Sequence, residues 1–301
     1  MNTNTMNLQK EKKYILNPYV YYLLDDKEMV LQNAQGVVRI HENRLKDFII
    51  EWDTFGSMNV PIDELNSRFG KDAEDAIHFL KTYNVIKEIP LPNLEVKKIK
   101  IYSNHSAIEQ HLQNILKKDY GEIIDIESHL NDDLSANEIE VDEGDLIIVF
   151  LNPYNKTLAK EIRNRVSGIK NAYLMFSYVY NYAFYIDALY NSFLKSPCHI
   201  CHMSYIESQL RIDNQGNTTY QQMIDSLYTE DPYFKVETPL TQNHQYNIVT
   251  QLVNRISKVI MLDESPVVYS EAFIESSMFD ISTKKMRVDN PIHWELCDCY
   301  E

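Results

Sequence analysis

The sequence predicts an α/β protein of two domains, a winged-helix unit over residues 1–90 and a Rossmann-like domain over residues 94–301. Three observations lead to this prediction. Short β-patterned runs precede three helical patterns near the N-terminus, strands and helices then alternate, and all four cysteines fall into two tight pairs. A chain of 301 residues, 44% of them apolar, can form two hydrophobic cores.

The N-terminal unit is predicted to contain three strands and three helices. The strands are Tyr19 to Leu24, Met29 to Asn33 and Val37 to His41, separated by turn-rich breaks. Apolar residues then recur at helical spacing in three groups, which are Leu45, Phe48, Ile49 and Trp52; Ile62, Leu65 and Phe69; and Ala73, Ile77, Leu80 and Tyr83. This order of elements is typical of a winged helix.

Charge argues against a nucleic-acid partner. The formal net charge is -15, and the candidate recognition helix, Asp72 to Tyr83, carries Asp72, Glu74 and Asp75 against a single Lys81. Phosphate would repel such a helix, because DNA affinity comes mostly from Lys and Arg.

A winged helix can instead bind an extended peptide along a free strand edge. The predicted groove lies between the strand Gly36 to His41 and the helix Asp72 to Tyr83. Its candidate residues are Val37, Val38, Arg39 and Ile40 on the strand and Asp75, His78, Phe79 and Thr82 on the helix. The alternative is a purely structural domain for homodimerisation or packing, because edge strands are often simply covered.

Residues 89–93, with two prolines, form the predicted linker. Beyond it, strands are predicted at 96–103, 123–127, 146–152 and 172–178, with helices at 107–118 and 158–166. Helices at 220–227 and 245–262 and strands at 267–275, 278–282 and 285–288 complete the domain. Residues 119–145 contain eleven acidic residues and neither Lys nor Arg, so residues 128–144 are predicted to form a solvated loop.

Glycines are scarce where a nucleotide site would need them. A Rossmann unit uses glycines at its first strand-helix turn so that backbone N–H groups can approach phosphate. This chain has Tyr102-Ser103-Asn104-His105-Ser106 there, and Asn152-Pro153-Tyr154-Asn155-Lys156 after the central strand. We therefore expect the nucleotide site to be degenerate or absent.

The cysteines predict a structural zinc site. Cys198 and Cys201 form a C-x-x-C pair, and Cys297 and Cys299 form a C-x-C pair near the C-terminus. Two cysteine pairs from distant segments are a usual way to supply four tetrahedral ligands. A redox C-x-x-C is the alternative, but we do not expect this motif to open a helix after a strand in a thioredoxin-like setting, and the second pair would stay unexplained. His199 and His202 could substitute as ligands.

The sequence predicts a cytoplasmic protein without a membrane partner. It has no run of 18 apolar residues, and Met1 to Lys13 lacks the apolar core of a signal peptide. A reducing compartment favours zinc thiolates over disulfides.

Two stretches resemble the ThiF-like (ubiquitin-activating-enzyme-like) subunits of azole-forming peptide synthetases, of the microcin-synthetase B-subunit type. The first runs from Tyr185-Ile186-Asp187 to Cys198-His199-Ile200-Cys201, and the second from Phe279-Asp280-Ile281 to Cys297-Asp298-Cys299. The resemblance implies a winged-helix element that grips the leader of a ribosomally made precursor peptide. It also implies two partners, a YcaO-type cyclodehydratase that forms azolines using ATP and a flavin-dependent azoline dehydrogenase.

The function expected from these features is a non-catalytic, zinc-stabilised scaffold for thiazole or oxazole formation in bacteriocin or thiopeptide biosynthesis. The missing glycine-rich loop sets the chain apart from active ubiquitin-activating enzymes. The main alternative is an ATP-dependent adenylating activator of a peptide or carrier protein. A metal-responsive DNA-binding regulator is a third class, which the acidic helix disfavours.

Overall fold

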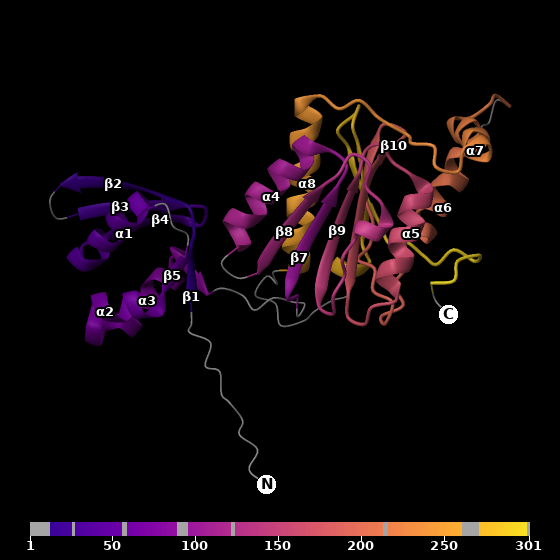
Figure 1. Ribbon diagram of the computed structural model, residues 1–301. Coiled ribbons are helices and arrows are strands. Elements are labelled where there is room, and N and C mark those ends of the chain that lie inside the picture. The colour runs from indigo at the N-terminus through magenta and orange to yellow at the C-terminus, as the bar shows by residue number, and fades with distance from the viewer. Residues whose placement is uncertain are drawn as a thin grey trace, which may run out of the picture. The chain divides into compact units, whose positions relative to one another are not determined.

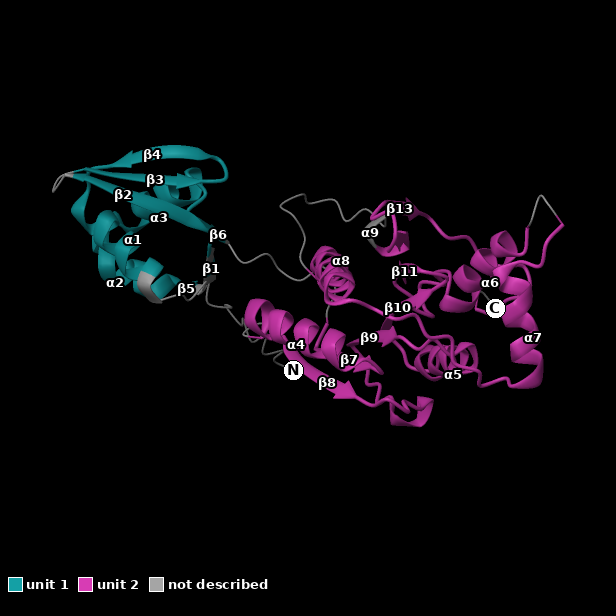
Figure 2. Cartoon of the chain, turned by 90° about the horizontal axis from the view of Figure 1, so that it is seen from above, with its two compact units in different colours: residues 1–91 teal, residues 92–301 magenta. Residues whose placement is uncertain are grey.

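The computed structural model describes residues 13–25, 28–55, 59–88, 96–121, 124–212, 216–260 and 271–299. The chain divides into two compact units, unit 1 comprising residues 1–91 and unit 2 residues 92–301 (Figures 1 and 2). Each unit has its own core, so each is described by itself.

Unit 1 is built on a three-stranded antiparallel sheet followed by three helices. The sheet contains β2 (Tyr19–Asp25), β3 (Glu28–Asn33) and β4 (Gly36–Ile40) in that order. The helices are α1 (Asn43–Phe55), α2 (Ile62–Phe69) and α3 (Ala73–Thr82), with a short 3-10 turn, η1 (Gly70–Asp72), before α3. The side chains of Met29, Leu31 and Ile40 point from the sheet into a core shared with these helices.

The described part of unit 1 also contains a second sheet that the sequence did not predict. Its strands are β1 (Lys13–Leu16), β5 (Asn59–Pro61) and β6 (Ile86–Glu88), in the order β5-β1-β6. Strands of three or four residues are too short to show a period-2 pattern, so the prediction of three strands was incomplete.

Unit 2 contains a seven-stranded mixed sheet in the order β13-β12-β11-β10-β9-β7-β8. Four strands are parallel: β7 (Lys98–Ser103), β8 (Asp125–Leu130), β9 (Asp145–Leu151) and β10 (Tyr173–Tyr180). The antiparallel strands β11 (Ala183–Ile186), β12 (Ser276–Asp280) and β13 (Met286–Asp289) extend one side. Every residue of β9 is buried, as expected for a central parallel strand.

Helices cover both faces of this sheet (Figure 1). Helices α4 (Ser106–Tyr120) and α8 (Gln242–Ile260) pack on one face, and α5 (Lys156–Ser167) and α6 (His199–Leu210) on the other. Helix α7 (Tyr220–Glu230) follows α6 and contributes Ile224 to the same core as α5. The two layers arise from strict alternation, because Phe176 and Tyr178 face α5 and α6 while Met175 and Val179 face α4 and α8.

Two predictions on unit 2 need correction. Part of the strand predicted at 267–275 is a short helix, α9 (Glu271–Ile274), and residues 261–270 lie outside the described residues. The predicted loop at 128–144 is anchored by buried Leu134 and Ile139, and it contains the end of β8 and a 3-10 turn, η2 (Ala136–Glu138). None of the described helices is both long and apolar enough to cross a bilayer.

Candidate functional site

The four cysteines of unit 2 meet at one buried point. Cys198 lies at the start of α6 and Cys201 one turn later, while Cys297 and Cys299 come from the C-terminal tail. The Sγ atoms of Cys198 and Cys297 are 3.5 Å apart, and those of Cys201 and Cys299 are 3.4 Å apart. All four sulfurs lie within 4.8 Å of one another, and all four residues are buried.

This donor set fits a tetrahedral zinc ion. A Zn–S bond of about 2.3 Å places the sulfurs of a tetrahedral site about 3.8 Å apart, close to the distances found here. The tail is held in place by Arg163 of α5, whose Nη2 lies 2.6 Å from Oδ1 of Asp298. This hydrogen bond lowers the pKa of Asp298.

A helix does begin at the C-x-x-C motif, because Cys198 is the N-cap residue of α6, but residues 187–197 separate it from the preceding strand β11. A redox pair nevertheless explains the geometry less well. The sulfurs of Cys198 and Cys201 are 4.0 Å apart, farther than the two contacts that join the distant pairs. The four thiols therefore form one cluster rather than a dithiol with two bystanders.

The histidines next to these cysteines face away from the cluster. Nδ1 of His199 lies 2.7 Å from Oδ2 of Asp187, and Nδ1 of His202 contacts Oδ1 of the same carboxylate. Burial alone would raise the pKa of Asp187, but the two histidines hold it below its ordinary value. His293 does reach the cluster, with Nδ1 3.3 Å from Sγ of Cys299.

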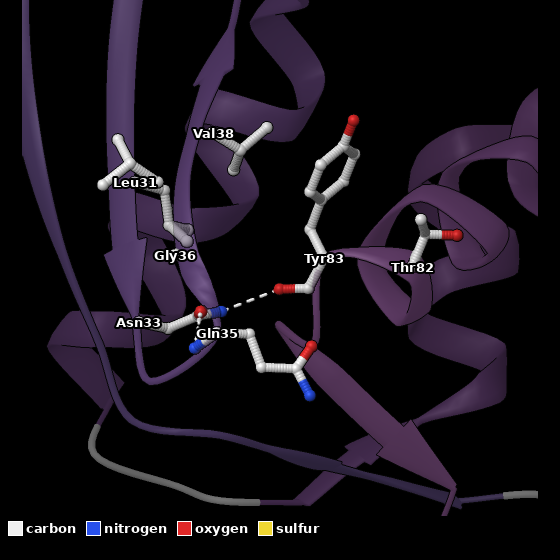
Figure 3. Close-up of a pocket in the computed structure, with 8 residues that line it drawn as sticks. Leu31, Asn33, Gln35, Gly36, Val38, Thr82 and Tyr83 are labelled. Carbon is white, nitrogen blue, oxygen red and sulfur yellow. Dashed lines mark hydrogen bonds between the residues drawn. The ribbon is translucent and has the colours of Figure 1, made fainter.

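A second candidate site is a pocket in unit 1, beside the edge strand β4 (Figure 3). Its volume is about 180 Å³, and its lining residues are Leu31, Asn33, Gln35, Gly36, Val37, Val38, Thr82 and Tyr83. Nδ2 of Asn33 donates a hydrogen bond to the carbonyl oxygen of Tyr83 at 2.7 Å, which ties the β3-β4 hairpin to the end of α3. Among the described strands, β4 pairs with β3 alone, so its other edge is available for pairing.

The register of the hairpin tells which main-chain groups of β4 reach the free edge. Asn33 pairs with Gly36 across a two-residue turn, and such a turn closes on a hydrogen-bonded pair. Hydrogen-bonded and non-hydrogen-bonded pairs alternate, so Val38, opposite Leu31, also bonds to β3. The N–H and C=O groups of Val37 and Arg39 therefore point to the free edge.

Three predicted groove residues line this pocket: Val37, Val38 and Thr82. Arg39 is exposed and pairs with Glu28 at 3.3 Å. The other predicted residues do not line the pocket. Ile40 is in the core, Asp75 and His78 are exposed on α3, and Phe79 is half-buried behind the pocket residue Tyr83, with the two ring centroids 4.6 Å apart.

The sequence interpretation missed Asn33 and Tyr83 as pocket residues. It placed Tyr83 on the apolar face of the third helix, but Tyr83 lies just beyond α3 and is 42% exposed. The predicted helix ends one residue later than α3, because the end of a helix is poorly marked in sequence. Asn33 could have been identified from the sequence, because asparagine next to a predicted turn often hydrogen-bonds to nearby backbone groups.

A third concavity lies at the carboxyl ends of β7 and β9 in unit 2. Helix α4, after β7, covers one face of the sheet and α5, after β9, covers the other, so this is the switch point where open α/β sheets bind ligands. The cavity measures about 210 Å³, below the ~300–1,000 Å³ of typical ligand pockets. Asp132, Asp133 and Glu161 line it together with Lys235, and Lys235 is paired with Asp133 at 2.8 Å.

A segment of the chain itself, residues 231–238, crosses this switch point. The backbone of Val236 exchanges two hydrogen bonds of 2.8 Å with Tyr154, and the amide of Asn152 binds both backbone groups of Thr238. The N-terminus of α5 is capped by Asn155, whose Oδ1 accepts from the N–H of Leu158 at 2.9 Å. One backbone N–H at the start of α5, that of Leu158, is thus already hydrogen-bonded within the chain and is not available to bind phosphate.

Comparison with known proteins identifies the family. A family model described as "Microcin B17-processing protein McbB" matches residues 14–301. The chain belongs to this family. Microcin B17-processing protein McbB of Escherichia coli is 22% identical over 173 residues, which are 56% of this chain and 57% of that relative. The alignment therefore spans little more than half of the relative's length.

Solved structures agree with this assignment at the level of the fold. A chain of the E. coli microcin synthetase McbBCD complex with pro-MccB17 bound matches with a TM-score of 0.75 at 17% identity, covering 95% of this chain and 99% of that chain. The McbBCD complex matches with a TM-score of 0.54. A heterocyclase in complex with substrate and cofactor matches with a TM-score of 0.52 at 9% identity, over 96% of this chain and 39% of that one. The α/β architecture, with a small N-terminal sheet and a larger mixed sheet, is therefore that of the McbB fold.

Proposed function

We propose that this McbB-family chain is a scaffold that binds the leader of a ribosomally made precursor peptide. It presents the peptide to a YcaO-type cyclodehydratase, and a flavin-dependent azoline dehydrogenase then acts on the rings. The rings formed are thiazoles or oxazoles, and the final product is a bacteriocin or a thiopeptide. The match to a microcin synthetase complex with pro-MccB17 bound supports the peptide as ligand and the synthetase subunits as partners.

The observation that carries the proposal is the free edge of β4 beside a pocket at the end of α3. An extended peptide pairing with β4 would bond to the main chain of Val37 and Arg39, which supplies affinity with little regard to sequence. One of its side chains would enter the pocket next to Tyr83, which supplies specificity. We therefore propose that unit 1 binds the leader as a winged helix binds an extended peptide.

A non-catalytic role is supported by the state of the switch point in unit 2. Its acidic lining of Asp132, Asp133 and Glu161 would repel a nucleotide phosphate, and residues 231–238 cross the place where a ligand would lie. We propose that unit 2 serves as a structural domain, and that its four cysteines hold one zinc ion. The zinc would join the C-terminal tail to the start of α6.

The test is a pair of substitutions at Val37 in the full chain. Val37→Pro removes an edge N–H without touching the β3-β4 ladder, whereas Val37→Ala keeps the N–H and loses only side-chain contact. Fluorescence polarisation with a labelled synthetic leader of the cognate precursor peptide should give at least ~10-fold weaker binding for Val37→Pro, about 1.4 kcal/mol, and a smaller change for Val37→Ala.

Equal affinity of Val37→Pro and the unchanged chain, with the same circular dichroism spectrum, would exclude β4 as the peptide site. Val38→Pro serves as a comparison variant for Val37→Pro. Because the N–H of Val38 bonds to β3, this substitution should lower the stability of unit 1 rather than act on the peptide alone.

A further inference from the structure

Asp187 lies directly after β11, on the face of the sheet covered by α6, and is 2% exposed. Its backbone N–H donates to the carbonyl oxygen of Phe176 at 2.9 Å, so the sheet itself fixes its position. Its two carboxylate oxygens accept from His199 and His202, one oxygen for each imidazole. A carboxylate only accepts hydrogen bonds, so each histidine presents its Nδ1–H to Asp187.

A third buried group completes the arrangement around His199. Nε2 of His199 and the hydroxyl of Tyr154 share a hydrogen bond of 2.9 Å. The imidazole also packs on the ring of Phe176, with centroids 4.4 Å apart. Tyr154 belongs to the loop after β9, so the first turn of α6 is tied to the sheet at two separate strands.

The histidines and cysteines form two parallel rows on the first turn of α6. Cys198 and Cys201 are three residues apart, and so are His199 and His202. Residues at this spacing lie on one face of a helix. The two rows are offset by one residue, about 100° around the helix axis. Any rotation of this turn that displaces the imidazoles from Asp187 must therefore displace the two thiols from Cys297 and Cys299.

We propose that Asp187 is a positioning residue for the cysteine site. By binding both imidazoles it sets the rotation of the first turn of α6, and thereby holds Cys198 and Cys201 at the spacing that one metal ion requires. This role rests on the proposed zinc site, and it is separate from the peptide site of unit 1. Residues that hydrogen-bond a metal ligand directly typically contribute 10–100-fold to metal affinity, and Asp187 acts on the ligands Cys198 and Cys201 through the helix turn that carries them.

The test uses the full-length, zinc-loaded chain and measures the rate of zinc transfer to a chromogenic chelator. Asp187→Asn keeps the shape of the side chain but turns one acceptor into a donor, so one Nδ1–H loses its partner. We expect zinc release to be at least ~10-fold faster. Tyr120→Phe is the control, because it removes a hydrogen bond of 2.6 Å to Ser257 in the opposite helix layer and should leave the release rate unchanged.

A second pair of variants keeps the test decisive if Asp187→Asn does not fold. His202→Leu removes one of the two donors, whereas His202→Asn retains a side-chain N–H near the place of Nδ1. We expect fast release for the first and near-normal release for the second. In the cobalt-substituted protein, the thiolate-to-cobalt absorption of His202→Leu should shift, reporting a distorted ligand set.

Two results would overturn the role, and they have different meanings. Unchanged zinc release and cobalt spectra in Asp187→Asn and His202→Leu would reject Asp187 as a positioning residue and leave the zinc site standing. A purified chain that binds neither zinc nor cobalt would reject the zinc site and this role with it. Peptide binding by unit 1 would be affected by neither outcome.

Discussion

The side-chain amide of Asn33 donates to the carbonyl oxygen of Tyr83 at 2.7 Å, joining the β3-β4 hairpin to the end of α3. Oδ1 of the same side chain accepts from the N–H of Gln35 at 3.0 Å, which orders the turn. One residue thus connects the two elements that border the pocket.

Asn33→Ala should weaken leader binding several-fold, because the strand and the helix end are then no longer held at a fixed separation. The loss of one hydrogen bond should cost about 1 kcal/mol in the free energy of unfolding. Gln32→Ala, one residue earlier and exposed, is the matched control. Equal leader affinities for both variants in a polarisation titration would show that the pocket does not depend on this contact.

Tyr83→Ala should weaken leader binding by about 1–2 kcal/mol, since the side chain is an exposed aromatic at a pocket and such residues often dominate binding. Tyr22→Ala is the control, because Tyr22 is 51% exposed on β2, away from the pocket. Isothermal titration with the synthetic leader measures both. If Tyr22→Ala has the larger effect, the peptide binds elsewhere on the sheet.

Cys198→Ser and Cys297→Ser should each abolish stoichiometric zinc binding, because each removes one of four ligands. Metal analysis of the unchanged chain should give about one zinc per chain. Structural zinc contributes ~10–16 kcal/mol in small peptide sites, comparable to the net stability of a domain, so both variants should also express poorly.

Acid should release the metal, because protons compete with zinc for the thiolates. Folded, soluble chain that contains no zinc at neutral pH would contradict the site. A disulfide between Cys198 and Cys201, found by mass mapping under native conditions, would instead favour the redox interpretation.

The isolated chain should neither bind nor hydrolyse ATP. The reason is electrostatic and steric, because Asp132, Asp133 and Glu161 line the switch point and residues 231–238 cross it. Calorimetric titration with Mg-ATP and a pyrophosphate-exchange assay on contaminant-free protein measure this. Exchange activity that follows the protein through purification would favour the adenylating alternative.

Several features of the molecule could be predicted from short-range patterns. The continuous apolar run of β9 indicated a central parallel strand, and the helical spacing of Leu65 and Phe69 indicated a buried face, as found. The pairing of the four cysteines indicated one cluster, because thiols in two tight pairs rarely have unrelated roles. These signals lie in residues close together in the chain.

Other features exist only after folding. The main-chain groups that β4 presents at its free edge depend on register, which the hairpin turn and the core set together. Asp187 contacts two histidines of α6, and residues 231–238 cross the switch point. Neither contact could be predicted, because sequence periodicity does not show which distant segments meet. The sequence by itself therefore determined most of the elements and the grouping of the four thiols, whereas tertiary packing decided what lines the pocket and what surrounds the thiols.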